Sequence, residues 1–275
     1  MLRVGIVNFI NTAPFYEPWK ALGPPSGWET VEGVPSKLNG LLRQGEIDAG
    51  LVSSFTYAEH PEGLVILEDI SISATGRVKS VLFLSPLPIE EIKGGVRIVV
   101  TPKSATSVML LRIILEIFMG RTYQRDFVFE QGELGTALAQ DRPYLAIGDE
   151  ALALAMDGIF EYSYDLGEIW ITETGLPFVF AVLAASKSSW EKHPDAYLAL
   201  YQHIQRCLES GLGHLDEISA KVAPRIPMDP EACLEYLRGI EYDLAEEKLR
   251  GLSCFYEYLN RLGIIASIPA LELIP

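Results

Sequence analysis

The sequence predicts an α/β protein of two lobes that ends in a helical tail. Short apolar runs alternate with segments of helical periodicity in two groups, one before residue 86 and one between residues 96 and 148. Alternation of this kind is typical of βαβ units built around a parallel sheet. A long apolar run at residues 178–183 then precedes a C-terminal part that has helical periodicity only. These observations indicate two sheets, helices that cover them, and a tail of helices.

Each expected strand is a short apolar run bounded by polar or turn-forming residues. In chain order these runs lie at residues 2–7, 48–52, 80–84, 97–100, 145–147 and 178–183. Each expected helix has apolar side chains three or four positions apart. Such helices follow strands at residues 35–42, 104–119 and 134–139, and make up the tail at residues 194–210, 214–222, 230–238 and 244–262.

The boundary between the two lobes is expected in a stretch marked by proline and glycine, at residues 86–95. No Gly/Ser-rich linker occurs, so the lobes should be joined by strands. We expect residues 1–88 and 183–275 to form the first lobe, with the C-terminal helices packed on it, and residues 89–182 to form the second. The cleft between two such lobes is the expected binding site.

The chain is acidic, with 22 Lys and Arg against 37 Asp and Glu and a formal net charge of -15. A surface of this sign repels phosphate groups, which argues against nucleic acids and anionic membranes as partners. No apolar stretch reaches the roughly 18 residues of a membrane span. Because Met1 leads directly into the first strand without a secretory signal, we expect a cytoplasmic protein.

The cysteines give no sign of a disulfide framework or a metal site. Cys207, Cys233 and Cys254 lie far apart, no C-x-x-C motif occurs, and no histidine is close enough in sequence to complete a zinc site. Cysteines in this arrangement fit a reducing compartment. We expect free thiols that pack as small apolar side chains, and no metal.

Polar residues where strands end are the candidates for ligand binding, because ligands of open α/β sheets bind beyond the carboxyl ends of strands. Asn11 follows the first strand and can present its amide to a ligand or close the turn with its own backbone. Ser53 and Ser54 follow the second strand. Their hydroxyls and main-chain N–H groups can bind a carboxylate at a helix start, or Ser54 can be an ordinary N-cap.

Two further candidates lie in the second group of strands. Four hydroxyl side chains occur within residues 101–107, at the start of the longest apolar helix of this half. Ser104, Thr106 and Ser107 can therefore form an anion site at a helix N-terminus, with capping as the alternative. Asp149 follows the strand at residues 145–147, where it can contact a ligand or cap the next helix.

Motifs of other chemistries are missing. The chain has no G-x-S-x-G, G-x-x-x-x-G-K-[ST], G-x-G-x-x-G or H-E-x-x-H, so nothing indicates a nucleophile elbow, a nucleotide cofactor or a catalytic metal. Three of the four histidines lie in the helical tail, where surface or packing roles are expected, and His60 ends a helix. Residue chemistry alone thus indicates a two-lobed anion binder with hydroxyl and amide groups in its site.

Seven stretches, in their order and spacing, resemble the chorismate dehydratases of the futalosine route to menaquinone. They are VNFINTAP at residues 7–14, PSKLN at 35–39, GEIDAGLVSSFTY at 45–57, GRVKSVL at 76–82, SATSV at 104–108, IGD at 147–149 and TGLPFVFA at 174–181. The resemblance implies a type II periplasmic-binding-protein fold. It also implies that chorismate, a dianion, loses water to give 3-[(1-carboxyvinyl)oxy]benzoate, without a cofactor.

The same resemblance implies roles for residues. Asn11 and Ser80 match the positions next to the reacting centre, and Asn11 would orient the departing C4 hydroxyl. Substrate-binding positions match Ser53, Ser54, Ser104, Thr106, Ser107 and Asp149. Neither Asn11 nor Ser80 is a good base at neutral pH, so the hypothesis is that the substrate's own side-chain carboxylate takes the proton.

One departure from the family concerns charge. The family often has Arg before its Thr-Ser pair, whereas this chain has Ala105, so Lys79, Arg77 or Lys103 would supply the positive charge. An alternative function is a non-catalytic solute-binding protein of the same fold for a small carboxylate. The sequence leaves open whether the chain acts alone or as a homodimer.

Overall fold

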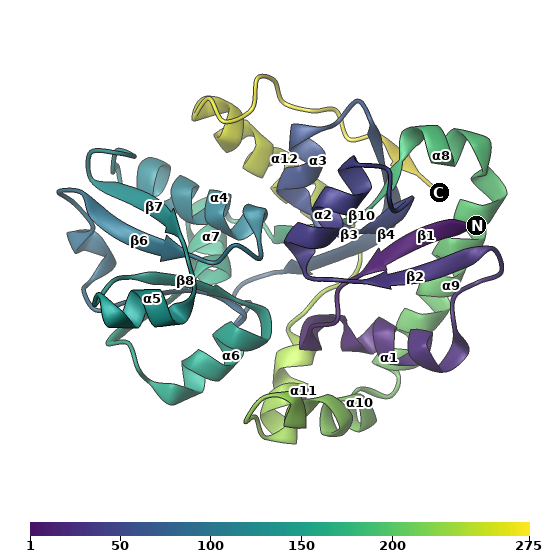
Figure 1. Ribbon diagram of the computed structural model, residues 1–275, viewed down its shortest axis with the longest axis horizontal. Coiled ribbons are helices and arrows are strands. Elements are labelled where there is room, and N and C mark those ends of the chain that lie inside the picture. The colour runs from purple at the N-terminus through teal and green to yellow at the C-terminus, as the bar shows by residue number, and fades with distance from the viewer. The chain divides into compact units, whose positions relative to one another are not determined.

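The computed structural model describes all residues from 1 to 275, which form two compact units with one sheet each (Figure 1). Unit 1 comprises Met1–Ile72, Phe180–Ala245 and Pro269–Pro275, and unit 2 comprises Ser73–Val179 and Glu246–Ile268. The chain passes from one unit to the other within strands β4 (Leu64–Ala74) and β10 (Phe178–Ser186). The prediction of an α/β fold in two parts joined by strands is confirmed.

The sheet of unit 1 has six strands in the order β11-β4-β10-β3-β1-β2. Strand β1 (Leu2–Ile6) lies between β2 (Trp28–Glu32) and β3 (Ala49–Ser53) and runs parallel to both. Strand β10 is antiparallel to β3, and the short β11 (Leu273–Ile274) runs parallel to β4. The parallel β1–β3 pair brings the carboxyl ends of both strands to the same edge of this sheet.

The helices of unit 1 cover both faces of this sheet (Figure 1). On one face lie α2 (Pro35–Arg43) and α3 (Ser54–Glu59), and on the other lie α1 (Ala13–Leu22) and α9 (Pro194–Leu212). The remaining helical segments are η1 (Ile10–Thr12), α8 (Lys187–Lys192), α10 (Leu215–Val222), η4 (Ala223–Arg225) and α11 (Pro230–Arg238). None of the helices in the chain has the length and apolar composition that crossing a bilayer requires.

The sheet of unit 2 has five strands in the order β7-β6-β8-β5-β9. They are β5 (Val81–Ser85), β6 (Val96–Val100), β7 (Phe127–Gln131), β8 (Tyr144–Ile147) and β9 (Tyr162–Asp165). Strand β6 is parallel to β7 and β8, whereas β5 is antiparallel to both of its neighbours. The amino end of β5 therefore lies beside the carboxyl end of β8.

The helices of unit 2 also lie on both faces of its sheet. Helix α4 (Ala105–Ile113) and α7 (Leu166–Thr174) share one face, and α5 (Leu134–Ala139) and α6 (Gly148–Asp157) share the other (Figure 1). The single helix expected at residues 104–119 is α4 followed by a π-helical turn, η3 (Ile114–Phe118). A short 3-10 turn, η2 (Ile89–Glu91), precedes β6.

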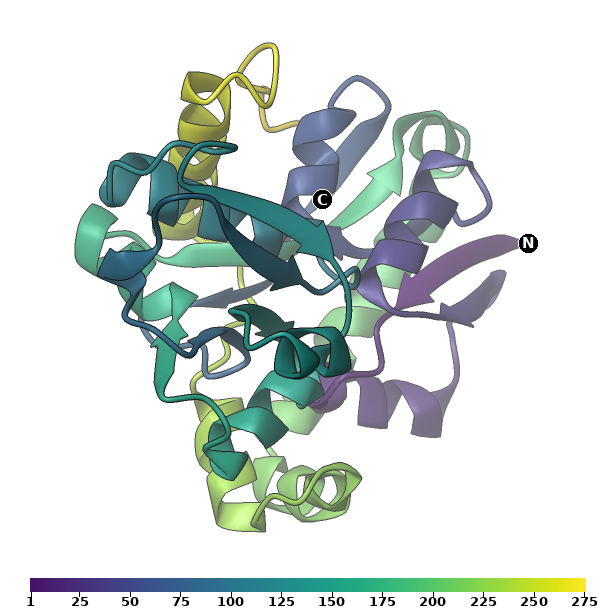
Figure 2. The same ribbon diagram turned by 60° about the vertical axis from the view of Figure 1, so that its left-hand side comes forward.

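Two parts of the chain belong to a different unit from the one expected. Strand β5 was expected in the first lobe but pairs with β8 and β9 in unit 2. Helix α12 (Glu246–Arg261), the yellow helix of Figures 1 and 2, was expected on the first lobe but packs in unit 2 beside α4. The reason is its apolar face, where Phe255 contacts the rings of Trp170 and Phe178, and Gly251 lies against the Pro177 carbonyl.

The expected roles of cysteines and tail histidines hold. None of the three cysteines forms a disulfide, Cys207 and Cys233 are buried, and burial raises the pKa of Cys207 to about 11. His203 is buried with its ring edge-on to Trp19, while His193 and His214 are exposed.

Close packing of α1 against α9 gives a prediction for stability. A Cβ atom at Gly211 on α9 would lie 1.5 Å from the main-chain oxygen of Pro14. At the exposed Gly213 the nearest atom would be 3.4 Å away. We expect Gly211→Ala to lower the free energy of unfolding by about 3 kcal/mol, because overpacking must push the helices apart.

Urea unfolding measures this effect, with Gly213→Ala as the matched control. The control should change the free energy of unfolding by less than about 1 kcal/mol, since it only removes backbone freedom at a helix end. Equal stability of the two variants would contradict the packing described for α1 and α9.

Candidate functional site

Asn11 lies in the loop that follows β1, at the edge where the parallel strands β1 and β3 both end. Its side-chain oxygen is buried and has no hydrogen-bond partner. The turn is held instead by Thr12, whose hydroxyl donates to the main-chain oxygens of Val7 at 2.6 Å and Phe9 at 2.8 Å. Of the two roles left open for Asn11, turn closure is thus performed by its neighbour, and its amide oxygen lacks the donor that a buried acceptor needs.

Ser53 and Ser54 lie at the same edge of the unit 1 sheet, where β3 ends and α3 begins. Both are buried. Ser53 occupies the N-cap position of α3 and its side chain makes no capping bond, while Ser54 is the first residue of the helix, so the expected Ser54 cap is wrong. The main-chain N–H of Ser53 donates to the Asn39 side chain on α2 at 3.1 Å, which fixes the end of the strand.

In unit 2 the predicted residues lie along one edge of the sheet. Ser80 precedes β5, and its main-chain oxygen accepts a hydrogen bond from Gly148 N–H at 2.7 Å, at the carboxyl end of β8. The neighbouring β6 ends beside β8, where Thr101 N–H donates to the main-chain oxygen of Leu145. These bonds bring three candidates to one edge of the sheet of unit 2: Ser80, Asp149 at the start of α6, and the hydroxyl-rich segment at the start of α4.

The start of α4 combines a cap with two buried hydroxyls. Ser104 is the N-cap, and its Oγ accepts from Ser107 N–H at 3.2 Å. The hydroxyls of Ser104 and Ser107 also lie 3.0 Å apart. The capping alternative therefore applies to Ser104, whereas Thr106 and Ser107 lie buried within the first turn.

Asp149 is in the first turn of α6 and does not cap it, because the N-cap position belongs to Ile147. A carboxylate in a first turn interacts favourably with the positive end of the helix dipole. The next residue, Glu150, forms an ion pair with Lys103 at 3.1 Å. Capping by Asp149 is therefore wrong, whereas its place directly after β8 is as expected, and its contact with a ligand stays a prediction.

The turn that precedes Ser80 is held by a buried carboxylate that sequence analysis missed. Asp165, the N-cap of α7, accepts hydrogen bonds from the main-chain N–H groups of Val78 at 3.1 Å and Lys79 at 2.6 Å. It also accepts from Gly167 and Glu168 at the start of α7. Lys79 has a φ of 59°, in the left-handed region, which requires such external support for a residue with a side chain.

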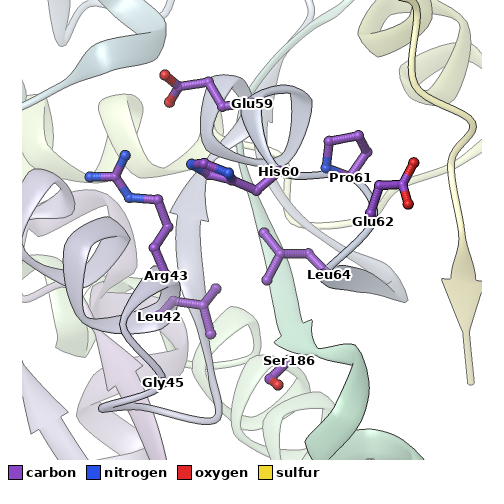
Figure 3. A pocket seen from close by; sticks show the side chains of 10 residues that line it. Leu42, Arg43, Gly45, Glu59, His60, Pro61, Glu62, Leu64 and Ser186 are labelled. Atoms are coloured by element: carbon purple, nitrogen blue, oxygen red, sulfur yellow. The ribbon is translucent and has the colours of Figure 1, made fainter.

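The histidine nearest to these residues in sequence, His60, lies elsewhere. It follows the C-terminus of α3, whereas Ser53 and Ser54 lie at the N-terminus. Figure 3 shows His60 and Arg43 directed toward each other in a pocket of about 440 Å³ beside Ser186. This pocket is at the end of the sheet where β3 starts and β10 finishes, opposite to the edge of Asn11.

The charges around that pocket do not favour the anionic ligand that the sequence predicts. Arg43, Glu59, His60 and Glu62 are all exposed, and the two carboxylates oppose binding of an anion by the arginine. The predicted residues instead form two groups, one in each unit: Asn11 with Ser53 and Ser54, and Ser80 with Ser104, Thr106, Ser107 and Asp149. The residues that hold these groups were not predicted from the sequence, although Thr12 and Asn39 lie in stretches that carried the resemblance and Asp165 does not.

The sequence matches a protein family described as menaquinone biosynthesis over residues 2–261. It is also 32% identical over 273 residues to the chorismate dehydratase of Thermus thermophilus, a match that covers 94% of each chain. The family match over residues 2–261 spans parts of both units and every candidate residue of the site.

Solved structures with the same arrangement of elements have little sequence in common with the chain. Protein AF1704 of Archaeoglobus fulgidus superimposes with a TM-score of 0.77 at 18% identity, covering 96% of this chain and 98% of that one. The alkanesulfonate-binding protein SsuA of Xanthomonas axonopodis gives a TM-score of 0.71 at 14% identity, covering 99% and 97%. The chain therefore has a periplasmic-binding-protein-like fold and belongs to the menaquinone biosynthesis family.

Proposed function

We propose that the protein is a chorismate dehydratase, which converts chorismate into 3-[(1-carboxyvinyl)oxy]benzoate and water. The proposal rests on membership of the family and on the match to the Thermus thermophilus enzyme along almost the whole chain. In this reaction the ring loses the proton of C3 and the hydroxyl of C4, and the electrons of the C3–H bond complete the aromatic ring. Because aromatisation drives the reaction, the enzyme mainly has to position the reacting bonds.

The observation in the structure that carries the proposal is the side-chain oxygen of Asn11. It is a buried acceptor without a donor, at the sheet edge where ligands of this type of fold are expected. A hydroxyl group of a ligand satisfies such an oxygen, whereas a carboxylate does not. We propose that Asn11 accepts a hydrogen bond from the C4 hydroxyl and orients it for departure.

The remaining candidates would bind the substrate through hydroxyl groups. Ser80 follows the turn that Asp165 holds, and its hydroxyl donates to the main-chain oxygen of Val78 at 3.3 Å. This long bond would be exchanged for one to the substrate near the reacting centre. The two carboxylates of chorismate would be bound by hydroxyls at the strand ends, from Ser53, Ser54, Ser104, Thr106 and Ser107. Hydrogen bonds to an ionised acceptor are about twice as strong as neutral ones, so hydroxyl groups can hold a carboxylate where few cations are present.

The proton of C3 would go to the carboxylate of the substrate's own enolpyruvyl side chain. Neither a serine hydroxyl nor an amide is basic enough for this step at neutral pH. Asp149 is the one candidate carboxylate among the proposed binding residues. Its role would be to position the substrate and not to act as the base.

The first prediction concerns the activity itself. Purified protein incubated with chorismate, without added metal or nucleotide, should form a product lighter by one water molecule. Mass spectrometry and the absorbance of the new aromatic ring measure this product. Chorismate that binds but stays intact would instead support a solute-binding protein, and absence of both binding and turnover would contradict both functions.

The second prediction concerns Asn11 and Ser80. Asn11→Ala and Ser80→Ala should each lower kcat by about a hundredfold or more, which is typical for the loss of one hydrogen bond to the reacting centre. Two controls match them in residue type and place. Asn8→Ala removes an exposed amide from the same loop, bonded to Glu32 and Arg225, and Ser85→Ala removes a buried hydroxyl from the other end of β5.

The two control variants should keep kcat within about threefold of the wild-type value, since they touch no group assigned to the transition state. Circular dichroism and Tm measurements must show that all four variants fold. Wild-type rates in both Asn11→Ala and Ser80→Ala would contradict the proposed roles even if the protein converts chorismate.

The third prediction tests the proton acceptor. Asp149→Asn should raise KM and lower kcat by less than about tenfold, whereas removal of a general base costs 10² to 10⁴ in rate. Single-turnover kinetics with saturating chorismate separates the two effects. If the variant binds chorismate with unchanged affinity and has lost turnover, Asp149 is the base and the substrate carboxylate is not.

A further inference from the structure

The main chain of Asn11 is tied to a residue that lies far away in the sequence. The hydroxyl of Tyr242 donates a hydrogen bond to the main-chain oxygen of Asn11 at 2.8 Å, across 231 positions of the chain. Tyr242 is only 6% exposed, and burial raises its pKa well above the ordinary value of 10. The phenol is therefore neutral near pH 7, and its proton is committed to the Asn11 carbonyl.

The segment that carries Tyr242 is itself fixed to the sheet of unit 1. The main-chain oxygen of Tyr242 accepts a hydrogen bond from Ser71 N–H at 2.7 Å, and the Ser71 hydroxyl donates to the main-chain oxygen of Asp243. Leu244 N–H donates to the Asp69 side chain at 3.4 Å. Because Asp69 and Ser71 belong to β4, the tyrosine connects the Asn11 loop to a strand inside the sheet.

Other contacts in the loop do not replace this connection. The two bonds of Thr12 fix the carbonyls of Val7 and Phe9, which precede Asn11. The side-chain oxygen of Asn11 makes no bond within the protein, so nothing else on that atom determines where the amide points. The direction of the amide then follows from the position of the Asn11 main chain, which Tyr242 holds.

We propose that Tyr242 is a positioning residue for Asn11, in the reaction proposed above. Tyr242 would not touch the substrate, since its hydroxyl is already bonded and its ring is buried. Its effect on the rate would come through the place and direction of the Asn11 amide. Displacement of a catalytic group by about 1 Å can cost a hundredfold in rate, so a small shift of this loop suffices.

The test compares two buried tyrosines whose hydroxyls donate to different main-chain oxygens of unit 1. Tyr242→Phe removes the hydroxyl bonded to Asn11. Tyr197→Phe removes the hydroxyl of another buried tyrosine of unit 1, which donates to the main-chain oxygen of Asp48 at 3.0 Å, at the opposite end of β3. We expect kcat for chorismate to fall about tenfold in Tyr242→Phe with KM unchanged, and to stay near wild type in Tyr197→Phe.

A double-mutant cycle separates positioning from general stability. In the Asn11→Ala background there is no amide left to place, so Tyr242→Phe should change kcat by less than about twofold. The same tenfold loss in both backgrounds would contradict a role through Asn11. Equal kcat and KM in the two tyrosine variants would contradict it as well.

Hydrogen exchange measures how firmly Tyr242 holds the Asn11 loop, independently of any turnover of chorismate. The amides of residues 8–13 should exchange about tenfold faster in Tyr242→Phe than in Tyr197→Phe, because one net hydrogen bond of the loop is lost. If the wild-type protein does not convert chorismate, the proposed function fails. Unchanged exchange in this loop would show that Tyr242 does not hold it, whatever the substrate is.

Discussion

The site of unit 2 depends on one buried carboxylate, that of Asp165. An ionised carboxyl group that is removed from water without partners costs several kcal/mol or more. Here four main-chain N–H groups converge on it, two from the turn before Ser80 and two from the start of α7. Burial raises the pKa of this carboxyl group, and the four donors counteract that effect. The carboxylate is satisfied only while turn and helix keep their present geometry, so it couples the place of Ser80 to the position of α7.

The surroundings of Asp165 show how little freedom this turn has. A Cβ atom at Gly167 would lie 2.5 Å from the main-chain oxygen of Gly76, so only glycine permits the approach of turn and helix. Gly76 and Lys79 both have positive φ. In unit 1 a neutral phenol acts on the Asn11 loop in a comparable way, through one bond instead of four. In both units, then, a candidate catalytic residue is placed by a buried side chain from a distant part of the chain.

Periodicity in the sequence located the interior strands and not the edge strands. All six strands expected from apolar runs lie inside their sheets, where both faces are covered. The strands that were missed include β2, β7, β9 and β11, each at the edge of its sheet. Edge strands have one side open to solvent. Polar residues interrupt the WETVE of β2 and the YSYD of β9, so no apolar run marks these two strands.

The long strand β4 was missed for a related reason, since Glu68 and Asp69 interrupt its apolar pattern. The bounds of the helices that were expected lie close to the observed ones, and α5 and α11 have the expected residues at both ends, whereas α1, α7 and α8 were not predicted. The unit on which a helix packs was harder, because an amphipathic pattern shows which face is buried and not against what. Helix α12 is the example, because its contacts with Trp170, Phe178 and Pro177 determine its unit. For the same reason the sequence named Asn11 and Ser80 but not Tyr242 and Asp165, whose partners are far away along the chain.

The cations that could replace the missing arginine near the start of α4 are not equivalent in the structure. Arg77 pairs with Glu168, and Lys103 pairs with Glu150. The lysine side chain of the second pair is 37% exposed and the glutamate side chain 26%, and ion pairs with this access to water contribute about 1 kcal/mol or less. If Lys103 left Glu150 and paired with a carboxylate of a ligand, little stabilising free energy would therefore be lost. In a protein with a net charge of -15, we propose that Lys103 would supply positive charge locally beside the first turn of α4, where attraction over long distances cannot.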